Sequence, residues 1–180
     1  EKIRHVPHLL VECGIRFAVV EALPRSKIDG VCFWLNKNSP VIGMTTLHDR
    51  IDNFWFVLRH ELEHVIQGHG QEHEIIDIEL GKEDESENEE ENIANSAGAE
   101  FCVNQDQMNS FYLRKAPYIS DNDVVAFASL HGIHPGLVVG QIHRRNEKWH
   151  TFRKHLVSIR EHILKSATVD GWGEVAPTEL

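Results

Sequence analysis

The chain has 180 residues, of which 41% are hydrophobic, and its formal net charge is −10. This length suits one domain with a sizeable core, no apolar run reaches the length of a transmembrane helix, and no secretory signal peptide opens the sequence. The net negative charge disfavours nucleic-acid binding, although seven of the acids fall within residues 83–91, a run typical of a solvated loop.

Cysteine usage indicates the compartment. Cys13, Cys32 and Cys102 are odd in number, widely spaced and without a CxxC pair, which argues against both a disulfide framework and thiolate zinc ligation. We therefore expect a protein of the reducing cytoplasm. The sequence begins at Glu1 rather than Met, as a piece of a longer protein would.

The first predicted element is a short amphipathic helix over residues 1–13, ended by Gly14. From Ile15 the apolar period changes to two, which predicts a strand over residues 15–19.

Two further strands are predicted after a turn at residues 24–30. Residues 31–35 and 41–46 have strand patterns, and residues 36–40 read as the hairpin connection between them. We expect an α+β fold in which a small antiparallel sheet of about three strands packs on the next helix.

That helix covers residues 53–68 and contains an HExxH pattern, His60-Glu61-Leu62-Glu63-His64. Histidines four residues apart share one helix face, so both imidazoles can reach one ion, and Glu61 can take a proton from a water on that ion. Apolar residues surround the helix on more than one side, which predicts burial. The competing interpretation is a core helix whose histidines are merely hydrogen-bonded.

Gly68 is expected to end this helix, and the polar residues that follow, up to residue 90, are interpreted as a connection. His69 is a weak candidate for a third metal ligand. It does not fit the spacing HExxHxxGxxH, in which Gly70 takes the place of the third histidine.

A second informative helix is predicted over residues 91–103. Glu91 begins one face of it, from which a carboxylate could reach an ion held by His60 and His64, and Asn95 could hydrogen-bond a ligand imidazole one turn later. Small residues on this face would allow another helix to approach closely. Spacing leaves three acids as competitors of Glu91, or Glu91 as a mere helix-starting acid: Glu87, Glu90 and Glu100.

Residues 111–117 read as a connection, and Ser120 as the cap of a helix that Gly132 ends. A further helix begins at His134, so that the pair resembles a helix-turn-helix in outline. Many helical hairpins share this outline, and DNA recognition is kept only as a minor alternative.

The C-terminal region is predicted to contain a mildly basic helix surface around Trp149, a helix over residues 151–165 and a flexible tail over residues 167–180. Residues 1–166 would then form the single domain.

The motifs together resemble one family. DNFWFVLRHELEHVI (residues 52–66), followed by an acidic connection and E-x-x-A-N from Glu91 to Asn95, is similar to the ImmA/IrrE zincin-like metallopeptidases. GVCFWLNKNSPVIGMTT (residues 30–46) and FASLHGIHPGLVVGQIHRR (residues 127–145) most resemble the domain that follows a helix-turn-helix segment in HigA-type antitoxin regulators.

The resemblance, which covers about residues 9–147, implies a zincin-like fold with zinc bound by His60, His64 and Glu91 and with Glu61 as general base. It also implies a bacterial or phage protein that cleaves or belongs to a helix-turn-helix repressor or toxin–antitoxin system, with an upstream DNA-binding domain that this chain lacks. The family usually has glycine before the second histidine. Glu63 stands there instead, which puts proteolytic turnover in doubt.

The expected chemistry is zinc-assisted hydrolysis of a peptide bond in an extended protein segment, which could dock along an edge strand. Four residues are equal candidates for an additional donor to the oxyanion: Tyr112, Tyr118, His131 and His134. The alternative is a catalytically weak or inactive zincin scaffold that acts as a protein-binding or sensing module. We expect no direct nucleic-acid or membrane binding by this chain.

Overall fold

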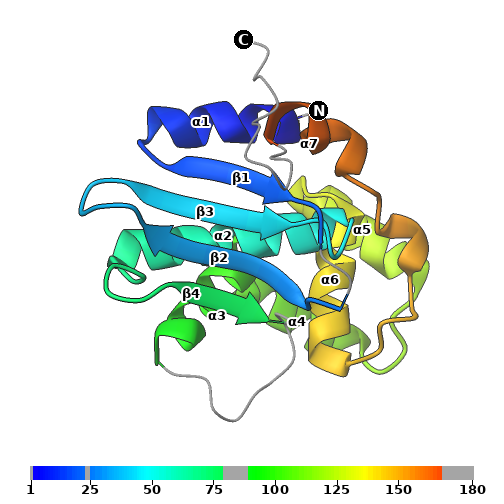
Figure 1. Ribbon diagram of the computed structural model, residues 1–180. Coiled ribbons are helices and arrows are strands. Elements are labelled where there is room, and N and C mark those ends of the chain that lie inside the picture. The colour runs from blue at the N-terminus through cyan, green and yellow to red at the C-terminus, as the bar shows by residue number, and fades with distance from the viewer. Residues whose placement is uncertain (1, 23–24, 79–88, 168–180) are drawn as a thin grey trace.

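A four-stranded mixed sheet forms one layer of the computed structural model, which describes residues 2–22, 25–78 and 89–167 (Figure 1). Across the sheet the strand order is β1-β3-β2-β4. The strands are β1 (Arg16–Val20), β2 (Ile28–Trp34), β3 (Pro40–Thr45) and β4 (Ile75–Ile78).

The sheet differs from the expected antiparallel one. The β2–β3 hairpin is present, but it turns back so that β3 lies between β1 and β2. As a result β3 runs parallel to β1, with Arg16 opposite Val41. The fourth strand, β4, pairs antiparallel with β2 inside the stretch interpreted as a polar connection.

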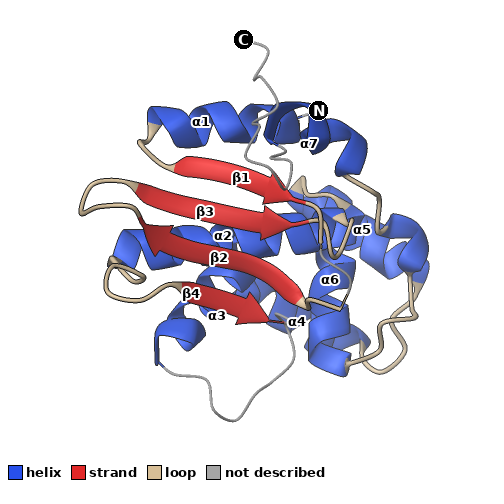
Figure 2. Cartoon of the chain, viewed as in Figure 1, coloured by secondary structure: helices blue, strands red, loops and turns tan. Residues whose placement is uncertain are grey.

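The helices cover one face of the sheet and one of its edges. Figure 2 shows α2 directly behind the strands, while α1 and α7 follow the edge formed by β1. The α-helices are α1 (Val6–Glu12), α2 (Ile51–Gln67), α3 (Glu89–Cys102), α4 (Gln105–Lys115), α5 (Asp121–His131), α6 (Pro135–Asn146) and α7 (Arg160–Ala167). Short 3₁₀ turns occur at Lys2–His5 and Arg153–His155.

Several helix ends follow the predicted signals. Gly68 and Gly132 end α2 and α5 in the left-handed conformation, with φ of 74° and 65°. Ser120 caps α5 in a capping box with Asp123. Ser120 accepts from the backbone N–H of Asp123, whose side chain accepts from the backbone N–H of Ser120.

Two predictions for the C-terminal half were wrong. Residues 111–115 belong to α4, because Asn104 caps that helix and Met108 and Phe111 bury one face of it. Residues 151–165 are not one helix. Phe152 adopts a left-handed conformation with φ of 52°, and α7 begins only at Arg160. Residues 168–180 of the predicted tail lie outside the described residues.

Helix α2 occupies the centre of the fold, between the sheet and α3. The face that packs most tightly is the one that carries Phe56, Val57 and the two histidines, all 2% exposed or less. The other apolar residues of α2 range from buried Phe54 and Leu58 to Ile66, which is 66% exposed. The face that carries the two histidines is therefore turned into the protein.

Helix α3 lies against α2 at close range. A Cβ at Gly98 would stand 3.0 Å from the carbonyl oxygen of Phe56 and 3.1 Å from its ring. The buried small residues Ala94 and Gly98 allow this approach, as the sequence predicted.

The α5–α6 pair does not leave its second helix free. Val138, Val139 and Ile142 are at most 1% exposed, and a Cβ at Gly140 would collide with Asp52 of α2. A recognition helix must instead present a free face to a DNA groove, so α6 is packed as a core helix. Over the described part of the chain, no helix is both long and apolar enough to cross a bilayer.

Candidate metal centre

Helix α2 presents two imidazole nitrogens to one point. Nε2 of His60 and Nε2 of His64 lie 3.0 Å apart, and both side chains have no exposed surface. The four-residue spacing explains this pairing, because residues one helical turn apart share a face.

Helix α3 brings Glu91 to the same point. One carboxylate oxygen of Glu91 lies 3.3 Å from His60 Nε2 and the other lies 3.5 Å from His64 Nε2. The competing acids lie elsewhere or outside the described residues. Glu90 is 3.8 Å from His69, Glu100 accepts hydrogen bonds from Asn104 and Gln105, and Glu87 is not described.

Strand β4 adds a carboxylate that the sequence reasoning missed. Oδ2 of Asp77 lies 3.3 Å from His60 Nε2, and Asp77 is 4% exposed. The three β-branched isoleucines around Asp77, at 75, 76 and 78, were the available signal for a strand. Because an acidic run follows, the whole segment was interpreted as a polar connection.

The other nitrogens of the two rings are held by neighbours. Nδ1 of His60 lies 3.1 Å from Oδ1 of Asn95, the contact that the sequence predicted. Nδ1 of His64 lies 3.1 Å from Nδ1 of His69, so one ring donates and the other accepts. These contacts leave both Nε2 lone pairs available to an ion.

Glu61 points from α2 toward β2. It is fully buried, and neither of its carboxylate oxygens meets a hydrogen-bond donor at satisfactory geometry. A Cβ at Gly30 of β2 would stand only 1.9 Å from Oε1 of Glu61. Glycine at this strand position therefore makes the space that Glu61 occupies.

The electrostatics of the cluster favour a cation. Burial alone would lower the pKa of His60, but the Asp77 and Glu91 carboxylates outweigh it and raise that pKa to about 9. Burial, followed by the charge of Asp77, raises the pKa of Glu61 well above its ordinary value. Burial and then the neighbouring His60 lower the pKa of His64.

The donor set fits a divalent metal. His60, His64, Asp77 and Glu91, named here the four-residue cluster, offer ligand atoms that all lie within 4.8 Å of one another. Imidazole nitrogen and carboxylate oxygen are zinc ligands. Buried carboxylate oxygens without hydrogen bonds are costly unless a proton or a cation satisfies them, and a zinc ion would do so here.

Glu63, which stands where the family that the sequence resembles usually has glycine, is held along its own helix. Its carboxylate accepts from Arg59 at 2.6 Å and from Gln67 at 2.7 Å. The hydrogen bond from Gln67 is the largest influence on the pKa of Glu63, which is lowered. Glu63 is thus engaged with its i±4 neighbours and does not belong to the four-residue cluster.

The four candidates for an additional oxyanion donor have other contacts. Tyr112 donates to Asn146, Tyr118 is 87% exposed, the ring of His131 packs on Phe127, and His134 accepts from the backbone N–H of Gly136 at the start of α6. None of them is a member of the four-residue cluster.

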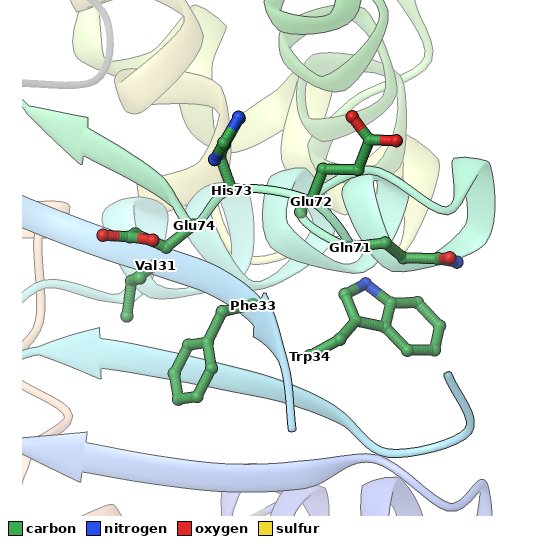
Figure 3. Close-up of a pocket in the computed structure, with 8 residues that line it drawn as sticks. Val31, Phe33, Trp34, Gln71, Glu72, His73 and Glu74 are labelled. Carbon is green, nitrogen blue, oxygen red and sulfur yellow. The ribbon is translucent and has the colours of Figure 1, made fainter. Parts of the chain in front are cut away.

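A separate hollow of about 400 Å³ opens on the other face of β2 (Figure 3). Val31 and Phe33 line it and alternate with buried Cys32, so they point away from α2. Trp34 is fixed at its rim by donating Nε1–H to the carbonyl of His69 at 2.7 Å. The lining includes no member of the four-residue cluster.

All three cysteines are free thiols, with Cys32 and Cys102 buried and Cys13 exposed, which agrees with the absence of a disulfide framework expected from their spacing.

Comparison of the chain with known proteins gives no assignment: no protein-family model matches it, and no curated protein matches it either.

Proposed function

We propose that this chain is a zinc-dependent, zincin-like metallopeptidase domain of a bacterial or phage transcriptional regulator or antitoxin system. It acts in the cytoplasm on a protein substrate, for which a helix-turn-helix repressor or a toxin is the leading class. The observation that carries the proposal is the convergence of His60, His64 and Glu91 beside the buried carboxyl group of Glu61. The resemblance of residues 52–66 and 91–95 to the ImmA/IrrE family supplies the substrate class.

In this proposal His60, His64 and Glu91 hold the metal, and Asn95 and His69 orient the two imidazoles. Bound zinc would supply Lewis-acid activation of a water molecule and of the scissile carbonyl. Glu61 would take the proton from that water on a carboxylate oxygen and deliver it to the leaving amine. A cation next to Glu61 favours its ionised form, which reverses the effect of burial and of Asp77 on its pKa.

The substrate would be bound as an extended strand. Among the described residues β4 is an end strand of the sheet, and the edge that faces away from β2 offers backbone groups to a peptide. Because Asp77 of β4 approaches His60, a peptide on that edge would run past the metal centre.

The test combines cleavage with metal content. The zinc-loaded protein is incubated with helix-turn-helix repressors from the same genome, and products are identified by intact mass. Glu61→Gln should keep zinc and lose cleavage by about a hundredfold or more, His64→Ala should lose both, and the surface variant Asp106→Asn should lose neither. Cleavage by Glu61→Gln at the wild-type rate would overturn the assignment of Glu61 as the base.

A second candidate is a metal-bound docking or sensing module without turnover. The observation that favours it is the buried Asp77 carboxylate within reach of the place where a catalytic water would bind. Zinc binding, together with stable capture of a cognate repressor that neither the wild type nor Glu61→Gln cleaves, would support this candidate over the peptidase.

A further inference from the structure

The proposed hydrolysis leaves one member of the four-residue cluster without a role. Asp77 is 4% exposed, and its Oδ2 makes no hydrogen bond of satisfactory geometry in the described structure. That oxygen instead lies 3.3 Å from His60 Nε2. Asp77 is therefore a buried carboxylate aimed at the same point as the three ligands already assigned.

The separations within the cluster are short enough for one ion to contact all four residues. Zinc–nitrogen and zinc–oxygen bonds of 2.0–2.2 Å place neighbouring ligand atoms about 3.3–3.6 Å apart in tetrahedral geometry. In the cluster the two Nε2 atoms lie 3.0 Å apart, and His60 Nε2 lies 3.3 Å from Asp77 Oδ2. Separate oxygens of Glu91 lie 3.3 Å from His60 and 3.5 Å from His64.

We propose that Asp77 is a fourth metal ligand that closes the centre in the resting protein, so that the peptidase is latent until Asp77 moves away. The inference rests on the proposed metal centre and adds a regulation of that same site. A structural zinc site has four protein ligands, whereas a catalytic one keeps a position open for water. Asp77 would occupy that position.

The local structure of β4 explains how a strand carboxylate is turned inward. Asp77 pairs with Gly30, and the register of β2 and β4 shifts between Ile28 and Gly30. The extra residue, Asp29, belongs to β2, whereas along β4 successive side chains alternate between the two faces as in any strand. Ile76 and Ile78 on either side of Asp77 are 49% and 63% exposed. The short strand therefore directs one carboxylate inward and two apolar side chains outward.

Placing this ligand on an end strand connects it to substrate binding. A peptide that pairs with the edge of β4 facing away from β2 would act on the strand that positions Asp77. Substrate docking and opening of the metal centre would then both involve strand β4.

The test measures metal and inhibitor binding on the purified chain, without any substrate. Zinc Kd is obtained by competition with a chelator, and acetohydroxamate is titrated against the cobalt-substituted protein and followed by its visible absorption. Asp77→Ala should raise the zinc Kd by about tenfold or more, because even the loss of a residue that only hydrogen-bonds a ligand costs about tenfold. The same variant should lower the Kd for acetohydroxamate by about tenfold or more, because the fourth position on the metal is then open.

Two further variants serve as a conservative replacement and a control. Asp77→Asn keeps the shape of the side chain, and should show the same two opposite changes if Asp77→Ala does not fold. Asp106→Asn removes an exposed carboxylate on α4 and should change neither Kd. If Asp77 only supported the strand, its replacement would not weaken zinc binding and strengthen hydroxamate binding at the same time. Unchanged Kd values in a folded Asp77→Asn protein would overturn the proposal.

These outcomes are distinguishable from failure of the proposed function. Opposite changes in the two Kd values, with no repressor cleaved by any variant, would support Asp77 as a ligand and count against the peptidase. Cleavage by the wild type with unchanged Kd values in Asp77→Asn would support the peptidase and overturn the fourth ligand. A wild-type chain that binds no zinc would overturn both.

Discussion

At the scale of single residues, the hydrogen-bond partner of His64 Nδ1 is the least common feature of the site. Metal-bound imidazoles usually donate their second nitrogen to a carboxylate, a carbonyl or water, and Asn95 acts in this way for His60. For His64 the partner is His69, whose own Nε2 lies 3.8 Å from Glu90. His69 then accepts from His64, which fixes the tautomer that leaves His64 Nε2 free.

His69→Ala should therefore weaken zinc binding although His69 is not itself a ligand. We expect the zinc Kd to rise about 10–100-fold, the usual cost of losing such a partner. His69→Gln should recover part of the loss, because its amide oxygen can accept the same hydrogen bond. His73→Ala, an exposed histidine of the same connection, serves as the control. A zinc Kd equal in the wild type and His69→Ala would show that Asn95 and packing suffice.

The residues of the centre divide into those that sequence spacing could place and those that it could not. His60, Glu61 and His64 share one helical turn pattern, and Asn95 follows Glu91 by one turn, so periodicity alone put each group on one face. Asp77 depends on the pairing of β4 with β2, and no local rule predicts that pairing from four residues. For His69 the sequence suggests only a ligand role, since no spacing rule predicts a contact between two histidine rings.

At the scale of elements, the close passage of β2 under α2 positions the proposed base. Gly30→Ala would force a methyl group into the space of Glu61 Oε1. We expect a loss of about 1–3 kcal/mol in the free energy of unfolding, typical of overpacking, together with a marked loss of cleavage, while zinc remains bound. Denaturant unfolding, a cleavage assay and zinc content measure the three quantities.

A matched control is available on the neighbouring strand. A Cβ at Gly43 of β3 would stand 2.7 Å from a methyl group of Val31, a side chain that can shift. Gly43→Ala should cost stability without displacing Glu61. If both variants lose cleavage equally, the effect of Gly30→Ala is one of stability and not of the position of Glu61.

The sheet shows where prediction at this scale ends. Alternating apolar residues identified three strands, and the hairpin at residues 36–40 correctly joined β2 to β3. The parallel β1–β3 pair could not be inferred, because it depends on which side of β2 the hairpin turns. β4 was missed, since four residues beside an acidic run give a weak periodic signal.

At the scale of the whole molecule, Asp49 joins the C-terminal helix to the start of α2. Its carboxylate accepts from the backbone N–H groups of Ile159 and Arg160, both at 2.8 Å, and from the Ser158 hydroxyl. Burial alone would raise the pKa of Asp49, but these hydrogen bonds outweigh it, and the pKa lies below its ordinary value.

The sign of the pH effect follows from this direction. A carboxyl group with a lowered pKa in the folded state contributes stability that is complete above the unfolded pKa, about 3.9, and is lost as the pH falls through the folded value. Asp49→Ala should cost about 0.5–2 kcal/mol near neutral pH, as for a lost helix cap. The difference from the wild type should shrink below about pH 4. Urea unfolding between pH 3 and 7 measures it, and a difference that is constant with pH would contradict the argument.

If the four-residue cluster holds the proposed zinc ion, the stability of the whole fold should depend on metal. His60, His64 and Asp77 are at most 4% exposed and converge with Glu91, so their charges face one another in the core when no cation separates them. A ligand that binds only the folded state adds RT ln(1 + [L]/Kd), about 2.7 kcal/mol at a hundredfold excess over Kd. For a chain of this size, such a change shifts the Tm by about 5–10 °C.

Chelation should therefore lower the Tm of the zinc-loaded wild type by that amount and leave the Tm of His64→Ala unaffected, because this variant has already lost a ligand. Calorimetry with and without chelator compares the two, and an equal shift in both would place the stabilising ion at another site.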